Sequence, residues 1–339
     1  AGFEESFVMQ FTNFTKEYKF TAKFVPMEFV KSETGKNDTF QLSDYLNRTA
    51  NEDGTFSIEY NGQPWSTILT TKPNVKVYIK TAEGENNTEI PSNKLTLEVT
   101  KDGAPVGMDA KANAGSYQVK LVYTDNNQTY TVDEKTFTIN KATVAITATG
   151  ITKEYDGTQN LVLPAGVTLT IEGNPADLTV DPNALQYESA DASTAAINIV
   201  LAANQTTCLT GDAAINYNVS LDGLTGTITP RKLIVTPKAK TFEYGENDKI
   251  TTALTTEFDY AGKNGDLPSG LTPTITGSMK LTTASGADVT VYNADTYNVA
   301  NKDLSAGTNY EIEFPATSVQ WTINRKLLTK VKNSGLPQS

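Results

Sequence analysis

The sequence predicts an all-β chain made of tandem immunoglobulin-like β-sandwich repeats in an elongated array. Residues that suit a pleated, half-buried surface are common: the 339 residues include 15 Tyr and 13 Phe, with many Val, Ile and Thr. Turn formers are common as well, with 23 Gly and 14 Pro. Short segments alternate apolar and polar residues, and two sets of residues recur at intervals of 89 and 95 positions.

The first 50 residues do not match these repeats. Residues 7–14 and 18–29 alternate aromatic and polar side chains, a pattern that is typical of strands. We therefore expect residues 1–50 to form an N-terminal β segment or a small extra domain. Residues 42–48 suit one short helical turn, and no other stretch has the period of an amphipathic helix.

Two markers define the repeats. The closing marker is an isoleucine that follows a threonine, and it occurs at Ile139, Ile228 and Ile323. The opening marker is a tyrosine that follows a glutamate, and it occurs at Tyr60, Tyr155 and Tyr244. Because two independent markers keep similar spacings, we predict three repeats, at residues 51–140, 141–231 and 232–328. The polar residues 329–339 are expected to form a disordered tail.

Further tyrosines relate the repeats to one another. An Asn-Ala-x-x-Tyr motif ends at Tyr117 in the first repeat and at Tyr297 in the third, and each is followed by a second tyrosine, Tyr130 or Tyr310. The middle repeat lacks the motif but keeps the second tyrosine as Tyr217. The motif resembles the tyrosine corner of immunoglobulin-like sandwiches, in which the hydroxyl bonds to nearby backbone. It favours that fold over the alternative, a β-grasp-like repeat.

The connections between the repeats are short. Each closing segment leads within a few polar residues into the first strand of the next repeat, and Pro230 fixes a backbone angle at one connection. No Gly- or Ser-rich linker intervenes, which favours an elongated array over freely tumbling domains. We expect a monomeric rod that acts as a spacer.

The chain is acidic, with 28 Lys and Arg against 39 Asp and Glu and a formal net charge of −11. Nucleic-acid binding and docking on an anionic membrane both depend on clustered Lys and Arg, so neither partner is expected. No run of about 18 apolar residues occurs, which argues against membrane insertion by this segment. Residues 1–7 lack a basic start followed by an apolar stretch, so we expect a signal peptide to be absent or already removed.

The residue inventory argues against an enzyme and against a metal or cofactor site. The chain has no His, the commonest general base and transition-metal ligand, and its single cysteine, Cys208, can form neither an internal disulfide nor a thiolate cluster. The stretches 84–87 and 125–127 lack the spacing of a calcium loop, and we expect solvated hairpin tips there. Paired carboxylates could serve a hydrolase, but thin repeats rarely form a deep pocket.

Two aromatic residues and one loop are candidate ligand contacts. Trp65 follows a loop-like stretch and, if exposed, could stack on a sugar ring together with Tyr45. Trp321 shares strand parity with neighbouring apolar residues, which predicts a core position. Residues 155–157, Tyr-Asp-Gly, either contact a ligand or place Tyr155 in the core and form a tight turn. Recurrence of the Glu-Tyr pair favours the second interpretation.

At these markers the sequence resembles the MBG-type and YDG-type tandem repeats of large bacterial surface adhesins. The middle repeat is similar to a YDG repeat at residues 153–158, 209–217 and 225–230. The third is similar to an MBG repeat at residues 242–245, 294–297 and 321–323. The repeat that ends at Ala142 is a weaker match to the MBG type.

This resemblance implies an exported, mucin-binding-like bacterial protein, attached to the cell surface or secreted, that serves in adhesion or as a stalk. It implies no catalytic residue and no cofactor. The candidate partners are host glycans or mucin, or other cell-surface components. The alternative to a stalk is a glycan- or mucin-binding module with a defined site in the N-terminal part, and the sequence leaves both open.

Overall fold

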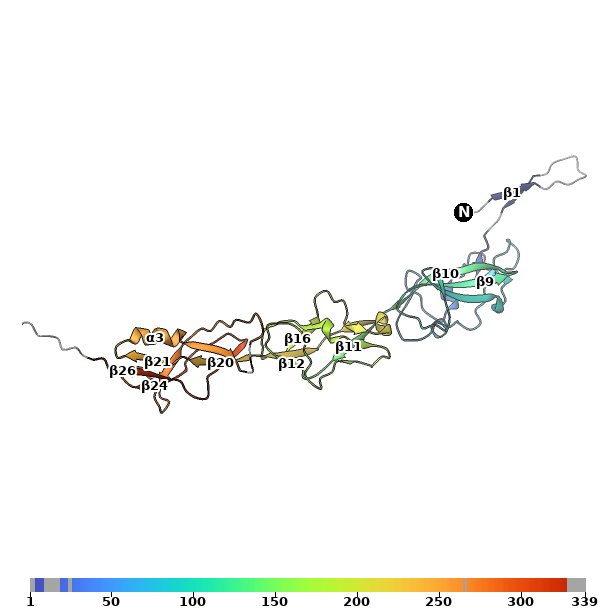
Figure 1. Ribbon diagram of the computed structural model, residues 1–339. Coiled ribbons are helices and arrows are strands. Elements are labelled where there is room, and N and C mark those ends of the chain that lie inside the picture. Colours follow the sequence, from blue (N-terminus) through green and yellow to red (C-terminus); the bar gives the residue numbers. More distant parts are fainter. Residues whose placement is uncertain (1–3, 9–18, 24–25, 264, 266, 328–339) are drawn as a thin grey trace, which may run out of the picture. The chain divides into compact units, whose positions relative to one another are not determined.

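The computed structural model describes residues 4–8, 19–23, 26–263, 265 and 267–327 (Figure 1). Strands dominate these residues and helices are few, so the all-β prediction is confirmed. The immunoglobulin-like sandwich, its β-grasp alternative and the elongated array stay predictions. The predicted tail lies outside the described residues.

Contacts divide the chain into two units. Unit 1 comprises residues 1–143 together with residues 212–218 from the middle repeat. Unit 2 comprises residues 144–211 and 219–339. A short segment of the middle repeat therefore belongs with the first repeat, an exchange that the sequence did not predict.

Unit 1 contains a five-stranded sheet with the order β4-β10-β9-β7-β8 and two smaller sheets, β3-β5-β6 and β1-β2. Residues 9–18, part of the predicted N-terminal strands, lie outside the described residues. The elements are β1 Glu4–Val8, β2 Lys19–Lys23, β3 Phe29–Val30, α1 Leu42–Tyr45, β4 Phe56–Glu59, α2 Trp65–Ile68, β5 Tyr78–Ile79, β6 Thr88–Glu89, the 3-10 helix η1 Ser92–Lys94, β7 Leu95–Lys101, β8 Ala104–Val106, β9 Gly115–Asp125 and β10 Gln128–Asn140.

The middle repeat contains the sheets β13-β11-β18, β12-β19-β16-β15 and β14-β17. The strands β11 and β18 pass from unit 1 into unit 2. The elements are β11 Ala142–Thr147, β12 Thr152–Glu154, β13 Thr170–Ile171, β14 Thr179–Val180, η2 Pro182–Ala184, β15 Leu185–Tyr187, β16 Ile197–Leu201, β17 Leu209–Thr210, η3 Asp212–Asn216, β18 Tyr217–Ser220 and β19 Thr225–Thr229.

The third repeat lies wholly in unit 2 and contains the sheets β22-β20-β25 and β21-β26-β24-β23. Its elements are β20 Arg231–Pro237, β21 Lys240–Glu243, α3 Asn247–Thr256, β22 Phe258–Gly262, β23 Met279–Thr282, β24 Thr296–Asn301, β25 Tyr310–Glu313 and β26 Gln320–Asn324.

The same four-stranded arrangement occurs three times, as β4-β10-β9-β7, β12-β19-β16-β15 and β21-β26-β24-β23. In each, a short first strand pairs in parallel with the strand that ends the repeat. The marker isoleucines lie in those closing strands and are buried: Ile139, Ile228 and Ile323. The two markers therefore identify equivalent positions in the three sheets, which is why their spacings agree.

The core of unit 1 crosses the predicted boundary at residue 50. Phe29, Phe40 and Leu42 pack in one cluster of buried side chains with Phe137 of the first repeat. These residues complete a thin core that the repeat alone would leave open. Among the described residues, these side chains before residue 51 therefore belong to the same core as the first repeat, and the boundary at residue 50 stays a prediction.

The helix α3 was not predicted. It spans ten residues and buries Ile250, Ala253 and Leu254 in the core of the third repeat, beside Trp321. These three residues share a helical face, but the segment also contains four Thr, whose branched side chains lower helix propensity. Tertiary packing forms this helix, and the expectation of no amphipathic helix is corrected. The predicted short turn is present as α1.

Candidate functional site

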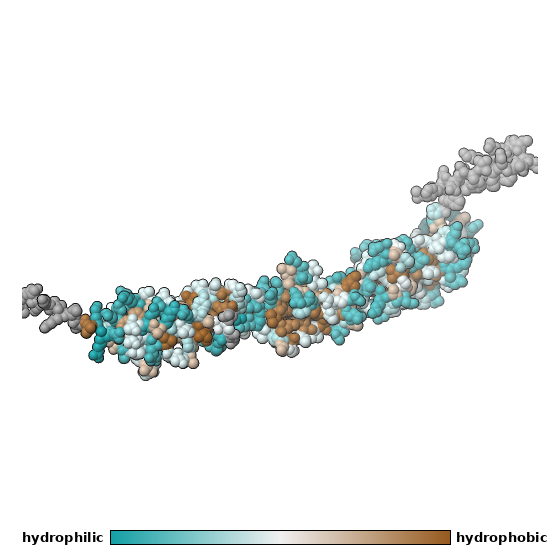
Figure 2. Space-filling model, viewed as in Figure 1, coloured by the Kyte–Doolittle hydropathy of each residue, from teal (hydrophilic) through white to brown (hydrophobic). Residues whose placement is uncertain are grey.

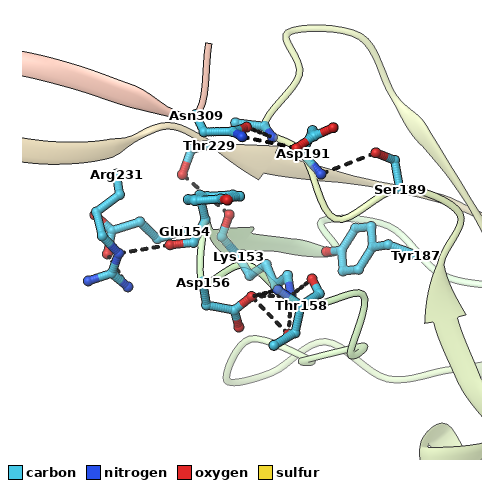
Figure 3. A network of polar contacts seen from close by, with 12 residues as sticks. Lys153, Glu154, Asp156, Thr158, Tyr187, Ser189, Asp191, Thr229, Arg231 and Asn309 are labelled. Atoms are coloured by element: carbon cyan, nitrogen blue, oxygen red, sulfur yellow. Dashed lines mark hydrogen bonds and ion pairs between the residues drawn. The ribbon is translucent and has the colours of Figure 1, made fainter. Parts of the chain in front are cut away.

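The Tyr-Asp-Gly loop surrounds a lysine of the chain itself. The Lys153 side chain is only 5% exposed, and its Nζ donates to Asp156 Oδ1 at 2.8 Å and to the Thr158 carbonyl at 2.7 Å (Figure 3). The same ammonium lies 5.4 Å from the centre of the Tyr187 ring. Gly157 has φ of 75°, a turn conformation that glycine adopts readily. The oxygens of this loop therefore already hold a cation.

The Asp156 carboxylate is the centre of that loop. Its Oδ1 also accepts hydrogen bonds from the Thr158 N–H and hydroxyl, both at 2.9 Å. Burial alone would raise the pKa of Asp156, but the hydrogen bonds from Lys153 and Thr158 outweigh it and hold the pKa below its ordinary value of 3.8. The loop thus contains an ion pair between Lys153 and Asp156 that stabilises its folded conformation.

The stretch 84–87 likewise binds a lysine side chain of the chain itself. Lys36 Nζ donates to the Glu85 carbonyl at 2.7 Å and to Asn87 Oδ1 at 2.8 Å. Asn87 is buried, and its Nδ2 donates to the Ser32 carbonyl at 2.9 Å. An ammonium is therefore bound by this stretch, and the burial of Asn87 corrects the expectation of a solvated hairpin tip at this residue. Among the described residues, no group of three or more His, Cys, Asp or Glu side chains is placed to hold a metal.

The stretch 125–127 is a hairpin tip, as predicted. Asn126 and Asn127 connect β9 to β10, and both have positive φ, 48° and 64°. Asparagine tolerates this conformation, which two-residue hairpin loops require.

The aromatic candidates do not form an exposed stacking surface. Trp65 is fully buried, and its ring packs edge-on against Tyr117 and Phe137 at 4.7 and 5.5 Å between centroids. It begins the helix α2, which turns the indole into the core, so the interpretation of Trp65 as a possible ligand contact is corrected. Tyr45 is half-buried against Phe40, and burial raises the pKa of its hydroxyl. Trp321 is buried, as expected.

The corner tyrosines behave as their motif predicts. Tyr117 donates its hydroxyl to the Asn113 carbonyl at 2.8 Å, and Tyr297 donates to the Asn293 carbonyl at 3.0 Å. Both rings are buried, 5% exposed. Each tyrosine therefore fixes the backbone of an asparagine four residues earlier.

In unit 1, an asparagine–tyrosine pair binds beside that fixed asparagine. Asn216 Oδ1 accepts a hydrogen bond from the Ala114 N–H at 2.7 Å, and its Nδ2 donates to Asn113 Oδ1 at 3.1 Å. The Tyr217 ring packs edge-on against Tyr60, with centroids 5.4 Å apart and planes at 83°. We call these five residues clamp 1.

Unit 2 contains the same arrangement, which we call clamp 2. Asn309 Oδ1 accepts from the Ala192 N–H at 2.7 Å, and its Nδ2 donates to Asp191 Oδ1 at 2.9 Å (Figure 3). The Tyr310 ring packs edge-on against Tyr155, again with centroids 5.4 Å apart and with planes at 78°. Tyr155 is half-buried in this contact, which corrects its predicted place in the core.

The clamps follow from the need to satisfy buried backbone groups. Ala114 and Ala192 are each 8% exposed, and a buried N–H without an acceptor is costly. Asn216, which is 2% exposed, supplies the acceptor in unit 1 and also donates from its amide nitrogen. Asparagine combines a carbonyl acceptor and two N–H donors on one short side chain, so it can make both bonds at once.

Clamp 2 carries an additional arginine. Arg231 Nε donates to the Tyr155 carbonyl at 2.8 Å, and Nη2 lies 3.2 Å from Glu154 Oε2. The Arg231 N–H also donates to the Asn309 carbonyl at 2.9 Å. In clamp 1 the position three residues after the marker isoleucine is Ala142, so this set of contacts has no side-chain equivalent there.

The tyrosines of both clamps were identified from the sequence as repeat markers, but their partners were not. Asn216 and Asn309 were the available signal, because both stand directly before a marker tyrosine. Their role could not be inferred from the sequence, since the alanine N–H groups that donate to them lie 102 and 117 residues away along the chain.

A YDG domain is found at residues 138–229. This range agrees with the YDG-like repeat predicted at residues 141–231, whereas the MBG type of the other repeats stays a prediction. No curated protein matches the sequence. Among solved structures, the chain is similar to SGBP-B of the Bacteroides ovatus mixed-linkage glucan utilization locus, in complex with a mixed-linkage heptasaccharide. The identity is 12%, the coverage 83% of this chain and 70% of that chain, and the TM-score 0.18, which is too low to carry an inference.

Hollows on the described surface are modest. One of about 240 Å³ lies among Pro237, Val299 and Phe314 and has no charged side chain in its lining. Another, of about 380 Å³, lies beside α3 and includes Asp248 and Glu257. On the face drawn in Figure 2, hydrophobic residues form small separate patches between hydrophilic ones. In the part of the chain that the structure describes, no helix has the length and apolar character to span a bilayer.

Proposed function

We propose that this chain is a non-enzymatic segment of a bacterial cell-surface protein, an adhesin or stalk built of tandem β repeats, in which clamp 2 sets the orientation of the second and third repeats. The observation that carries this proposal is the occurrence of one clamp twice in one chain, with the same ring separation and the same 2.7 Å bond to a backbone N–H. A contact repeated in this way is a building element of an array.

The physical argument is that the clamp is directional. Domains joined by a plain linker move relative to each other by default. Two hydrogen bonds from one amide group and an edge-on ring pair restrict rotation more than a flat apolar contact does, because each has a narrow range of favourable angles. Short connections add to the restriction. A stalk needs this property, since its length depends on fixed orientations.

Other observations support a structural role over catalysis. The chain has no His, and oxygen atoms of the loops at residues 84–87 and 155–157 accept hydrogen bonds from Lys36 and Lys153. Burial of Trp65 removes the leading residue of the alternative, a glycan-binding site in the N-terminal part. The YDG domain, with the resemblance of the markers to surface adhesins, supports an exported location.

Electron–electron distance measurements test the proposal. Spin labels at Asp222→Cys and Thr255→Cys, both exposed positions of unit 2, report on the orientation that clamp 2 sets, while Cys208 is 1% exposed and stays unlabelled. We expect a narrow distance distribution in the otherwise unchanged chain and a broad one when Asn309→Ala and Tyr310→Ala are added. Asn293→Ala is the matched control and should leave the distribution narrow.

A broad distribution without the clamp substitutions would refute the orienting role. A parallel screen of the full chain against glycans and mucin tests the alternative. Binding in that screen that survives Asn309→Ala with Tyr310→Ala would favour a recognition module over a stalk.

A further inference from the structure

The third repeat carries the receiving half of a clamp, by which we mean the asparagine and the alanine N–H that bind the partner's amide, together with the tyrosine that contacts the partner's ring. Asn293 and Ala294 stand four and three residues before the corner tyrosine Tyr297, as Asn113 and Ala114 stand before their own corner tyrosine in clamp 1. The Tyr297 hydroxyl fixes the Asn293 carbonyl at 3.0 Å. The backbone that presents the amide and the N–H is therefore built in the same way.

The third ring is also in place. Tyr244 follows the short first strand of its sheet, and its N–H donates to the Asn324 carbonyl at 2.8 Å. Tyr60 of clamp 1 has the same bond, to the Asn140 carbonyl, at the same distance. Asn324 and Asn140 both stand one residue after a marker isoleucine.

Nothing in the described residues occupies this receiving half. Tyr244 is 50% exposed, and Val291, two residues before Asn293, is 64% exposed. Within the described part of the chain, neither the Asn293 side chain nor the Ala294 N–H has a hydrogen-bond partner. The third repeat thus exposes a tyrosine and a valine, and among the described residues its Asn293 amide and Ala294 N–H have no partner, whereas the equivalent amide and N–H of clamp 1 are engaged.

We propose that Tyr244, Asn293 and Ala294 form a docking surface for an asparagine–tyrosine pair at the start of a strand in a further β repeat. The partner's asparagine would accept from the Ala294 N–H and donate to Asn293 Oδ1, and its tyrosine would pack edge-on against Tyr244. The inference rests on the proposed array function for the kind of partner. The chemistry of the pair comes from clamps 1 and 2, which show what covers the equivalent groups.

The residues after the last strand favour a partner joined in the same chain. Arg325, Lys326 and Leu327 repeat the Arg-Lys-Leu sequence that opens β20 at residues 231–233. Leu233 is fully buried in its repeat, whereas Leu327 is 93% exposed. A second copy of this chain is a poorer partner, because its pairs at Asn216 and Asn309 are already engaged and would have to leave their clamps.

Hydrogen exchange of the chain through Asn324, followed by one added repeat, tests this inference. The added probe is a copy of residues 230–327 placed directly after Asn324. Its Asn309 then follows Asn324 by the same 80 residues that separate Thr229 from Asn309 in the native chain. The Ala114 and Ala192 amides serve as internal references. We expect the Ala294 amide to exchange about tenfold or more slowly once the copy is present, because exchange then requires the new clamp to open.

Two variants sharpen the result. Asn309→Ala in the copy alone should return Ala294 to its original exchange rate, and Tyr244→Ala should weaken the protection. Unchanged exchange at Ala294, with the copy folded as judged by protection in its own β24, would overturn the docking surface. Slow exchange at Ala114 and Ala192 in that experiment would leave the array proposal standing, whereas fast exchange there would remove it.

A second probe keeps the test decisive if the first copy does not fold. A copy of residues 141–229 after Asn324 supplies Asn216 and Tyr217 in place of Asn309 and Tyr310. Protection of Ala294 by this copy supports the inference, and a folded copy that gives none refutes it.

Discussion

Removing the amide of clamp 2 by Asn309→Ala should destabilise the third repeat together with its attachment to the second. The substitution deletes the acceptor of the Ala192 N–H and the donor to Asp191, and it leaves the Tyr310 ring in place. Ala192 is 8% exposed, so its N–H cannot regain a full bond to water. A buried donor left unsatisfied costs about 1–3 kcal/mol, and loss of the partly exposed bond to a carboxylate adds about 1 kcal/mol. We therefore expect the free energy of unfolding to fall by about 2–4 kcal/mol.

Urea unfolding followed by Trp321 fluorescence measures this effect. Trp321 is buried in the third repeat, and a Trp65→Phe background removes the only other indole. At a typical urea m value of about 2 kcal/mol per molar, the midpoint should fall by roughly 1–2 M. Asn293→Ala is the matched control, because its side chain has no hydrogen-bond partner within the described residues, and it should change stability by about 0.5 kcal/mol or less.

Equal midpoint shifts for Asn309→Ala and Asn293→Ala would refute the clamp as a stabilising contact. A shift confined to the slope would instead indicate that the third repeat unfolds independently of the second. Either result would mean that the bonds of clamp 2 add no coupling between the repeats.

Three other changes test the loop and the core. The pKa of Asp156 in the folded chain lies below its unfolded value of 3.8, so its contribution to stability is present above that pH and is lost as the pH falls through the folded pKa. The urea midpoints of the native chain and of Asp156→Asn should therefore differ at pH 7 and converge toward pH 2. A difference that stays constant with pH would contradict this argument. Lys153→Met keeps the buried stem but removes the ammonium, and should cost about 2–4 kcal/mol by urea unfolding, with part recovered in the double variant with Asp156→Asn; an unchanged midpoint would contradict the ion pair. Burial raises the pKa of the Cys208 thiol, so Ellman's reagent at pH 8 should label it only as the chain unfolds, and fast labelling of the native chain would show that it is accessible.

The sequence predicted most of what depends on short-range pattern. Alternation and turn residues gave the strands, and the recurring Glu-Tyr and Thr-Ile pairs gave equivalent positions in three sheets, because those pairs occupy the parallel first and last strands. The helix α3 was not predicted because its four Thr lower the helix propensity and its apolar face consists of only three buried residues. Trp65 was a candidate ligand contact because the turn residues before it suggested a loop, whereas α2 directs the indole inward.

The clamps lay beyond sequence reasoning for a different reason. Their tyrosines were visible as markers, but a tyrosine that recurs is equally compatible with a core position and with an interface. The deciding partners are backbone N–H groups of Ala114 and Ala192, which carry no signature in the side-chain pattern. Contacts over more than a hundred residues depend on how the strands end, and that is a property of the folded sheets.

The sequence differences among the repeats are consistent with clamp contacts that are retained while residues of the core differ. The middle repeat lacks the corner tyrosine, having Ala195 four residues after Asp191, and it replaces the receiving asparagine by that aspartate. Its Ala192 N–H nevertheless has the same bond as Ala114, at the same 2.7 Å. A carboxylate oxygen accepts from an amide as well as an amide oxygen does, so the exchange preserves the geometry and strengthens the bond. The interior can therefore diverge as long as a short Asn-Tyr pair, a free N–H and a tyrosine remain in register, which is the requirement that an array of non-identical repeats imposes.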